Sequence, residues 1–219
     1  PHMAPGLYDA FGTEEFDDLY LKYEADKTIP KKTVPAQDLF FDLLKERAET
    51  GRIYIMNLDH CNSHSSFKDK VSMSNLCQEI TLPTTPIQDI HDEQGEIALC
   101  ILSAVNVGGL NDLSELENIC DLSVRALEQI IDYQDYPVKA AEVSTKKRRS
   151  LGIGDIGLTH YLAKHGVKYS DPKAWDLVDR LTEAFQYNLL RASCNIAMEK
   201  GKCEGFERTK YADGLLPID

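Results

Sequence analysis

The stretch Ser74-Asn75-Leu76-Cys77-Gln78-Glu79-Ile80, continued by Thr81-Leu82-Pro83, places an amide, a thiol and a carboxylate at alternate positions of an apolar run. Successive side chains of a strand point to opposite faces, so an extended backbone would bring Asn75, Cys77 and Glu79 onto one face. On a helix the same three side chains would spread over roughly 200° and could not meet one small ligand. The pattern therefore predicts a strand that presents the three groups together.

These residue types leave several kinds of chemistry open. A thiol can act as nucleophile, metal ligand, redox partner or hydrogen-atom donor, but nucleophilic use normally wants a nearby histidine, and the motif has none. Glu79 in apolar surroundings would have a raised pKa and could exchange protons near neutral pH. Asn75 could hold a hydroxyl or carbonyl group, and Cys100, in the next apolar run, could reach the same pocket. The set fits redox or radical chemistry on a small hydroxylated substrate.

Composition narrows the class of protein. The 219 residues, 42% of them hydrophobic, can bury a real core, as one large domain or as a piece of a larger one. A net charge of −12 argues against general DNA or RNA binding. The basic cluster 146–149 (Lys-Lys-Arg-Arg) is predicted to be a solvated loop or helix end, with phosphate binding as the weaker alternative. No apolar run approaches the roughly 18 residues of a membrane span, and no signal peptide is visible.

The cysteines indicate a reducing, cytoplasmic protein. They are scattered without a CxxC pair, unlike a secreted disulfide scaffold or a four-thiolate zinc site: Cys61, Cys77, Cys100, Cys120, Cys194 and Cys203. Cys120, Cys194 and Cys203 are interpreted as structural. The bunched set Asp59, His60, Cys61 and His64 could suggest a metal site, but a polar loop or plain surface explains it better.

Periodicity and punctuation predict an α/β architecture with largely parallel strands. Helices are expected at 13–24, capped by Thr13, and at 35–50, with Pro35 in the first turn and Gly51 as the C-cap. Further helices are expected at 112–132, 155–165 and 171–200, and strands at 52–56, 74–82 and 96–106. Buried stripes are expected on the second and last helices, including Leu39, Phe40, Leu43 and Leu44 on the former and Trp175 on the latter.

A glycine pattern, Gly152-Ile153-Gly154-Asp155-Ile156-Gly157, matches the G-x-G-x-x-G fingerprint of dinucleotide-binding proteins. That fingerprint requires a preceding apolar strand, whereas residues 145–150 are polar and basic. Close packing between a strand and a helix is the better interpretation, and a nicotinamide-dependent oxidoreductase is a distant alternative.

Three segments in chain order resemble one family. Residues 74–84 (SNLCQEITLPT), 95–100 (GEIALC) and 148–154 (RRSLGIG) are similar to the catalytic core of the large (alpha) subunit of class I ribonucleoside-diphosphate reductase. Shorter similarities extend the resemblance over nearly the whole chain: 36–39, 132–137, 161–164 and 214–219. The resemblance implies part of a ten-stranded α/β barrel, formed by residues 4–219, with a finger loop inside it. Residues 1–3 (Pro-His-Met) are interpreted as a cloning scar.

The resemblance also implies roles for single residues. Cys77, at the finger-loop tip, would be the thiyl radical that takes the 3′ hydrogen of a ribonucleotide. Glu79 would accept the 3′-hydroxyl proton, Asn75 would position the substrate hydroxyls, and Cys100 would be half of the redox pair that reduces the 2′ carbon. A dry barrel interior would protect the radical.

The resemblance finally implies what lies beyond this chain. The family's alpha subunit is much longer, so the chain is expected to be an engineered fragment or a split-gene product, inactive without the remainder of the subunit. No cofactor is expected on this chain itself. The radical would come from a metal-containing beta subunit, and the electrons from thioredoxin or glutaredoxin. The alternative function is a non-catalytic assembly fragment that docks with the complementary alpha polypeptide.

Overall fold

The computed structural model describes residues 3–216 and divides into two compact units. The first comprises the chain up to Thr84 together with the segment from Arg208 onward, and the second comprises Thr85–Glu207. Pro1 and His2 of the expected cloning scar, and residues 217–219 of the last resembling segment, lie outside the described residues.

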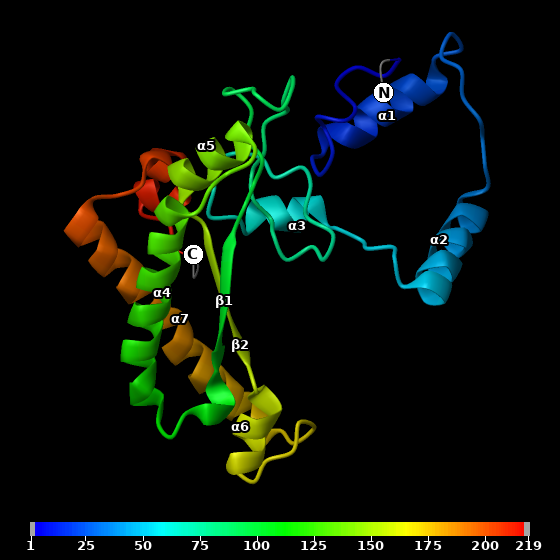
Figure 1. Cartoon of the computed structure of the whole chain (residues 1–219). Coiled ribbons are helices and arrows are strands. Elements are labelled where there is room, and N and C mark those ends of the chain that lie inside the picture. The colour runs from blue at the N-terminus through cyan, green and yellow to red at the C-terminus, as the bar shows by residue number, and fades with distance from the viewer. Residues whose placement is uncertain (1–2, 217–219) are drawn as a thin grey trace. The chain divides into compact units, whose positions relative to one another are not determined.

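The second unit contains a two-stranded parallel sheet and the longest helices (Figure 1). Strands β1 (Ile101–Asn106) and β2 (Leu151–Ile156) pair in register from Ile101 with Leu151 to Asn106 with Ile156. The helices are α4 (Leu116–Tyr133), α5 (Lys139–Arg148), α6 (Leu158–Lys164) and α7 (Lys173–Lys200). Short 3-10 turns complete the unit: η1 (Val107–Gly109), η2 (Leu113–Glu115) and η3 (Glu204–Arg208, ending at the unit boundary). The predicted α/β class with parallel strands is confirmed.

The core of this unit lies between the sheet and helices α4 and α7 (Figure 1). Helix α4 buries the apolar stripe that its period predicted: Leu116, Cys120, Val124, Leu127 and Ile131. The stripe meets β1 and β2 through Val105, Ile153 and Leu151, and meets α7 through Leu181 and Ala192. One face of the sheet is therefore covered by helices.

The first unit is built from short helices and irregular chain. Its elements are α1 (Glu15–Ala25), α2 (Ala36–Thr50), α3 (Leu58–Ser63) and the 3-10 turn η4 (Lys210–Asp213). The segment from Arg208 joins it through an antiparallel bridge between Phe67 and Thr209 and an ion pair from Arg208 to Asp69. Val71 is fully buried, and its backbone N–H and C=O both bond to the Asn62 side chain at 2.8 Å.

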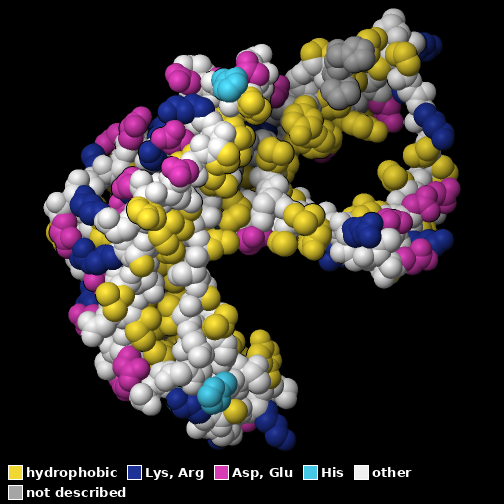
Figure 2. Space-filling model, in the orientation of Figure 1, with side chains coloured by type: hydrophobic (Ala, Val, Ile, Leu, Met, Phe, Trp, Pro, Cys, Tyr) yellow, Lys and Arg dark blue, Asp and Glu magenta, His cyan; other side chains and the backbone are white. Residues whose placement is uncertain are grey.

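Helices α1 and α2 bury no residue, which corrects the prediction of a buried stripe on α2. Leu39, Phe40 and Leu44 are exposed and Leu43 is half-buried, and apolar side chains show on the surface of both helices in Figure 2. The stripe exists in the sequence, but no described residue packs over it.

Two predicted strands are absent from the described residues. Residues 52–56 are irregular, with Tyr54 and Ile55 exposed, and residues 74–82 form a turn flanked by irregular chain. A strand needs a partner for its backbone groups, and neither segment has one here. The strand expected at 96–106 begins only at Ile101.

Smaller corrections concern helix ends and faces. Helix α1 begins at Glu15, so its N-cap is Glu14 and not Thr13, whose hydroxyl bonds backward to the Ala10 carbonyl at 2.7 Å. Pro35 is an N-cap rather than a first-turn residue, whereas Gly51 is the left-handed C-cap that was predicted. Helix α5 was missed, α6 starts after the residues expected to open it, and Trp175 is exposed.

Candidate active site

The Asn75–Glu79 segment is a tight turn with Leu76 and Cys77 at its tip. The Gln78 N–H bonds to the Asn75 carbonyl at 3.1 Å, and Gln78 adopts the left-handed conformation with φ 63°. Two side chains close the base of the turn. The Ser74 hydroxyl donates to the Ile80 carbonyl at 2.7 Å, and the Asn75 side-chain oxygen accepts from the Ile80 N–H at 3.0 Å.

The predicted row of three side chains on one strand face is therefore wrong. Asn75 is engaged within the turn, and Cys77 and Glu79 are exposed, so the apolar enclosure expected around Glu79 is absent from the described chain. The turn nevertheless brings all three within one short loop and leaves the Cys77 thiol accessible at its end. This arrangement suits a thiol that must reach a substrate.

Cys100 lies in the second unit, one residue before β1, and is half-buried. Its sulfur is 3.8 Å from the Ile101 carbonyl oxygen. A Cβ built on Gly152 of the neighbouring strand would lie 3.2 Å from that sulfur and 2.5 Å from Leu102 Cδ2. The glycine at 152 is thus what allows β2 to pass so close to the thiol.

The sheet face that carries this contact has no helix over it in the second unit. Leu102 and Ile156 on it are exposed, and a Cβ added at Gly154 would meet nothing within 4 Å. Alternate residues Ile153 and Val105 point instead to the helical core. Cys100 therefore lies at one end of an uncovered sheet face that includes Gly152 and Gly154.

A buried ion pair joins the segment before Cys100 to the end of α5, just before β2. Glu96, 5% exposed, pairs with Lys147 at 2.7 Å and with the guanidinium of Arg148, whose side chain is also 5% exposed. Burial alone would raise the pKa of Glu96, but hydrogen bonds from the two cations hold that pKa below its ordinary value. Arg148 also donates to the Ser144 hydroxyl at 3.1 Å.

Arg149 turns the chain from α5 into β2. It is the left-handed C-cap of α5, with φ 51° and ψ 44°, a conformation that costs a non-glycine residue roughly 1–2 kcal/mol. Its guanidinium bonds to both oxygens of Glu128 at 2.8 and 2.9 Å and to Asp132, which fixes the turn. The predicted helix end at 146–149 is confirmed. Lys146 is exposed there, as predicted, whereas Arg148 is buried, and all four cations pair with carboxylates, Lys146 with Glu142. Phosphate binding by the cluster is therefore disfavoured.

The glycine pattern does not form a phosphate-binding loop. Gly152 and Gly154 lie inside β2, and only Gly157, with φ 81°, stands at the start of α6. A Cβ at Gly157 would lie 2.6 Å from Asn106 Oδ1, so this glycine serves close packing of β1 against the α6 entrance. This is the strand-to-helix packing that the sequence favoured.

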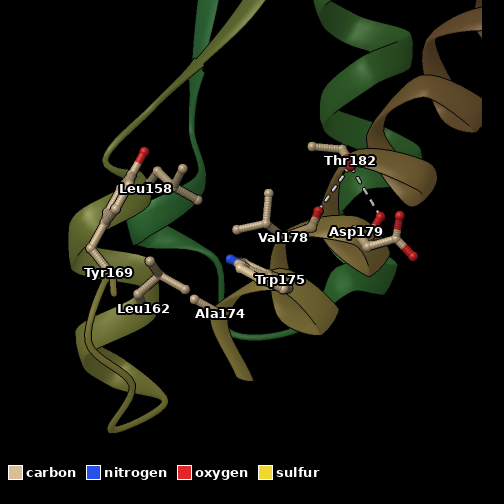
Figure 3. Close-up of a pocket in the computed structure, with 8 residues that line it drawn as sticks. All are labelled: Leu158, Leu162, Tyr169, Ala174, Trp175, Val178, Asp179 and Thr182. Carbon is tan, nitrogen blue, oxygen red and sulfur yellow. Dashed lines mark hydrogen bonds between the residues drawn. The ribbon is translucent and has the colours of Figure 1, made fainter. Parts of the chain in front are cut away.

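One further hollow, of about 380 Å³, lies between α6 and α7 (Figure 3). Helix α6 contributes Leu158 and Leu162, and the connecting loop contributes Tyr169. Helix α7 provides the rest of the lining: Ala174, Trp175, Val178, Asp179 and Thr182. The Thr182 hydroxyl bonds to the backbone carbonyls of Val178 and Asp179, as drawn in Figure 3. The mostly apolar lining contains no thiol and no acid–base pair, so this hollow does not compete with the turn and Cys100 as the catalytic candidate.

The other sequence candidates separate clearly. Cys120 is fully buried, and burial raises the pKa of its thiol to about 11, which confirms it as a core residue. Cys203 is half-buried with a pKa raised by burial, whereas Cys194 is exposed, unlike the structural residue that was predicted. Asp59, His60 and Cys61 lie on α3, and no group of potential metal ligands occurs among residues 3–216. Within the same residues, no helix has both the length and the apolar character to cross a membrane.

Sequence reasoning missed Glu96 and Arg148. Their signal was present, since each is a charged residue at the entrance to an apolar run, but the run alone does not reveal that the two charges meet 52 positions apart.

Comparison with known proteins decides the family. The family model described as "Ribonucleotide reductase, barrel domain" matches residues 1–219. The chain belongs to the ribonucleotide reductase barrel-domain family. The ribonucleoside-diphosphate reductase alpha subunit of Haemophilus influenzae is 57% identical over 224 residues, covering all of this chain and 30% of that protein. The ribonucleoside-diphosphate reductase 1 alpha subunit of Escherichia coli is 54% identical, and the ribonucleoside-diphosphate reductase alpha subunit of phage T4 is 39% identical, each with 29% of its own length covered.

The family resemblance read from the three segments is thus confirmed, and so is the α/β barrel class. The chain spans about 30% of the length of the relatives it matches. Two parallel strands are described here, so the ribonucleotide reductase barrel is not closed within residues 3–216.

Proposed function

We propose that this chain is part of the catalytic alpha subunit of ribonucleoside-diphosphate reductase, which converts ribonucleotides to 2′-deoxyribonucleotides by radical chemistry for DNA synthesis. The match of the barrel-domain family across residues 1–219 carries this proposal. The relatives named as ribonucleoside-diphosphate reductase alpha subunits, at 57% and 54% identity, support it.

Cys77 is the proposed radical residue. Its place at the exposed tip of a turn allows the sulfur to reach into a substrate site. As a thiyl radical it takes the 3′ hydrogen atom of the ribose, so a carbon–hydrogen bond breaks and a sulfur–hydrogen bond forms. Glu79 accepts the 3′-hydroxyl proton, and Asn75 orients the hydroxyl groups.

Cys100 is proposed as one thiol of the pair that supplies the two electrons. One thiol of the pair gives the proton with which the 2′ hydroxyl leaves as water, the other supplies the hydrogen that the 2′ carbon gains, and the two sulfurs join as a disulfide. The open sheet face beside Cys100 leaves room for a substrate and for the partner thiol.

The proposal includes the proteins that this reaction requires. A beta subunit with a metal centre generates the radical, thioredoxin or glutaredoxin reduces the disulfide again, and the rest of the alpha subunit completes the barrel in the cytoplasm. In this proposal the chain contributes Asn75, Cys77, Glu79 and Cys100 to the ribonucleoside diphosphate site, and the cofactor belongs to the beta subunit.

A chimera tests the proposal directly. Residues 4–219 replace the matching segment of the Haemophilus influenzae alpha subunit, and ribonucleoside-diphosphate reduction is measured with that organism's beta subunit and a dithiol. We expect turnover in the chimera, loss of at least about 10³-fold with Cys77→Ser, and no loss with the exposed Cys194→Ser as control. An active Cys77→Ser chimera contradicts the assignment.

The isolated chain is expected to be inactive under the same conditions. Turnover by the 219 residues alone, supplied with the beta subunit and a dithiol, would show that the remainder of the alpha subunit is dispensable.

A second candidate is an assembly fragment that docks with the complementary alpha polypeptide without catalysis of its own. The exposed apolar side chains of α2, Leu39, Phe40 and Phe41, favour it. Co-purification of the chain with that polypeptide, lost on Phe40→Ser, together with an inactive chimera, would select this function over the first.

A further inference from the structure

We propose that Glu96 and Arg148 are positioning residues that hold the Cys100 thiol in place against Gly152. This inference rests on the proposed redox function for its catalytic meaning. The positioning itself concerns only the second unit and can be tested separately.

The stretch that carries Cys100 is tied down at both ends by one short segment of chain. At its start, the Glu96 carboxylate is held by Arg148 and Lys147. At its end, the Ile101 N–H donates to the Ser150 carbonyl at 3.3 Å. Residues 148–150 therefore hold both ends of residues 96–101 in place.

The backbone of Glu96 is fixed as firmly as its side chain. Its N–H and C=O exchange hydrogen bonds with Thr85 at 3.0 and 3.1 Å, and the next N–H, of Ile97, donates to the Ala140 carbonyl at 3.2 Å. Residues 97–100 themselves form no strand. These end contacts, and not a strand ladder, therefore frame the stretch that carries Cys100.

Residues 148–150 also set the distance between the Cys100 thiol and β2. Arg149 turns the chain so that Arg148 faces Glu96 while Ser150 pairs with Ile101, and Gly152 then passes beneath the sulfur. Because a Cβ at 152 would lie 3.2 Å from that sulfur, the thiol has a defined place only while both segments stay in register. The ion pair maintains this register at the strand entrance.

Site-specific alkylation of the full 219-residue chain tests the inference. Iodoacetamide labelling rates are measured for every cysteine by peptide mass spectrometry in the unmodified chain, in Glu96→Gln and in Gly152→Ala. We expect Cys100 to label at least about threefold faster in both variants, because a loosened or displaced stretch exposes its half-buried thiol. The rates of buried Cys120 and exposed Cys194 should stay unchanged.

The control is Glu142→Gln, which removes a carboxylate from α5 that pairs with Lys139 and Lys146 at the surface. It should leave the Cys100 rate unchanged. An unchanged Cys100 rate in both Glu96→Gln and Gly152→Ala overturns the inference. So does a parallel rise at Cys120, which would show general loosening of the core.

If Glu96→Gln unfolds the unit, Arg148→Lys decides by the same criterion, since it keeps the positive charge but shortens the contact. In the chimera, Glu96→Gln should lower kcat at least about threefold with KM unchanged, as expected for a group that acts through Cys100. A fully active Cys100→Ser chimera would refute the redox role and leave the labelling result standing, so the two failures are distinguishable.

Discussion

The two candidate thiols are held in opposite ways. The turn at Cys77 is closed by neighbours in sequence, with every hydrogen bond at its base contributed by residues 74–80. The stretch at Cys100 is closed by residues about 50 positions away, through a buried ion pair and a strand contact. One thiol owes its place to local chain geometry and the other to tertiary structure.

This difference matches the tasks proposed for them. A turn that closes on itself can carry a reactive sulfur at an exposed tip without help from the surrounding fold. A redox thiol must meet a second thiol at bonding distance, so its position has to be fixed relative to other elements. Breaking local and distant contacts should therefore affect the two sites unequally.

The largest expected effect comes from Arg148→Met. It leaves the buried Glu96 carboxylate with Lys147 alone, and removing one partner of a buried pair typically costs about 3–5 kcal/mol. Urea denaturation followed by far-ultraviolet circular dichroism measures the free energy of unfolding. Ser74→Ala removes one hydrogen bond of the turn and should cost no more than about 1 kcal/mol in the same transition. Equal losses of unfolding free energy in the two variants would contradict the difference between a tertiary and a local contact.

Acid should remove the stabilisation that the Glu96 ion pair gives to the stretch that carries Cys100. The folded-state pKa of Glu96 lies below its ordinary value of 4.5, so its pairing stabilises the fold above pH 4.5 and is lost as pH falls through the lowered pKa. Denaturation midpoints between pH 6 and 3 should fall in the unmodified chain and fall less steeply in Glu96→Gln. Identical slopes would mean that ionisation of the Glu96 carboxylate does not contribute to the free energy of unfolding.

Two left-handed residues should respond with opposite signs to glycine. Gln78 and Arg149 have φ values of 63° and 51°. Arg149→Gly relieves backbone strain but removes the contacts to Glu128 and Asp132, for a net loss of about 1–2 kcal/mol. Gln78→Gly has no such ion pairs to lose and should be neutral or stabilising by about 0.5 kcal/mol. Thermal denaturation of both variants checks the signs.

The most local effect is expected within the turn. Asn75→Ala removes the acceptor of the Ile80 N–H, a hydrogen bond worth about 1 kcal/mol. Hydrogen exchange at the Ile80 amide should quicken about fivefold, while amides in α4 exchange as before. Unchanged exchange at Ile80 would mean that other contacts close the turn.

What the sequence could predict follows the same division between local and distant contacts. The helical period of Leu116, Cys120 and Val124 was enough to predict α4, because a helix forms its backbone hydrogen bonds within its own segment. Residues 52–56 and 74–82 looked like strands by composition, but a strand exists only with a partner, and composition does not supply one.

The site was predicted in part for the same reason. Asn75, Cys77 and Glu79 do share one short element, although it is a turn that Gln78 makes possible and not a strand. The meeting of Glu96 with Arg148 depends on the path of α5, which the polar composition of 138–150 concealed. The roles of the four candidate residues stay predictions until the chimera is assayed.

The glycine run of β2 has a consequence for mutational scanning. Gly152 and Gly157 are surrounded, by Cys100 and Leu102 in one case and by Asn106 in the other, whereas Gly154 faces empty space. Within the isolated chain, a saturation library should tolerate many side chains at 154 and almost none at 152 or 157. A run that matches one fingerprint by its letters thus contains three positions under unrelated constraints, and the permissive one offers an attachment point for a spectroscopic label on the same sheet face as Cys100.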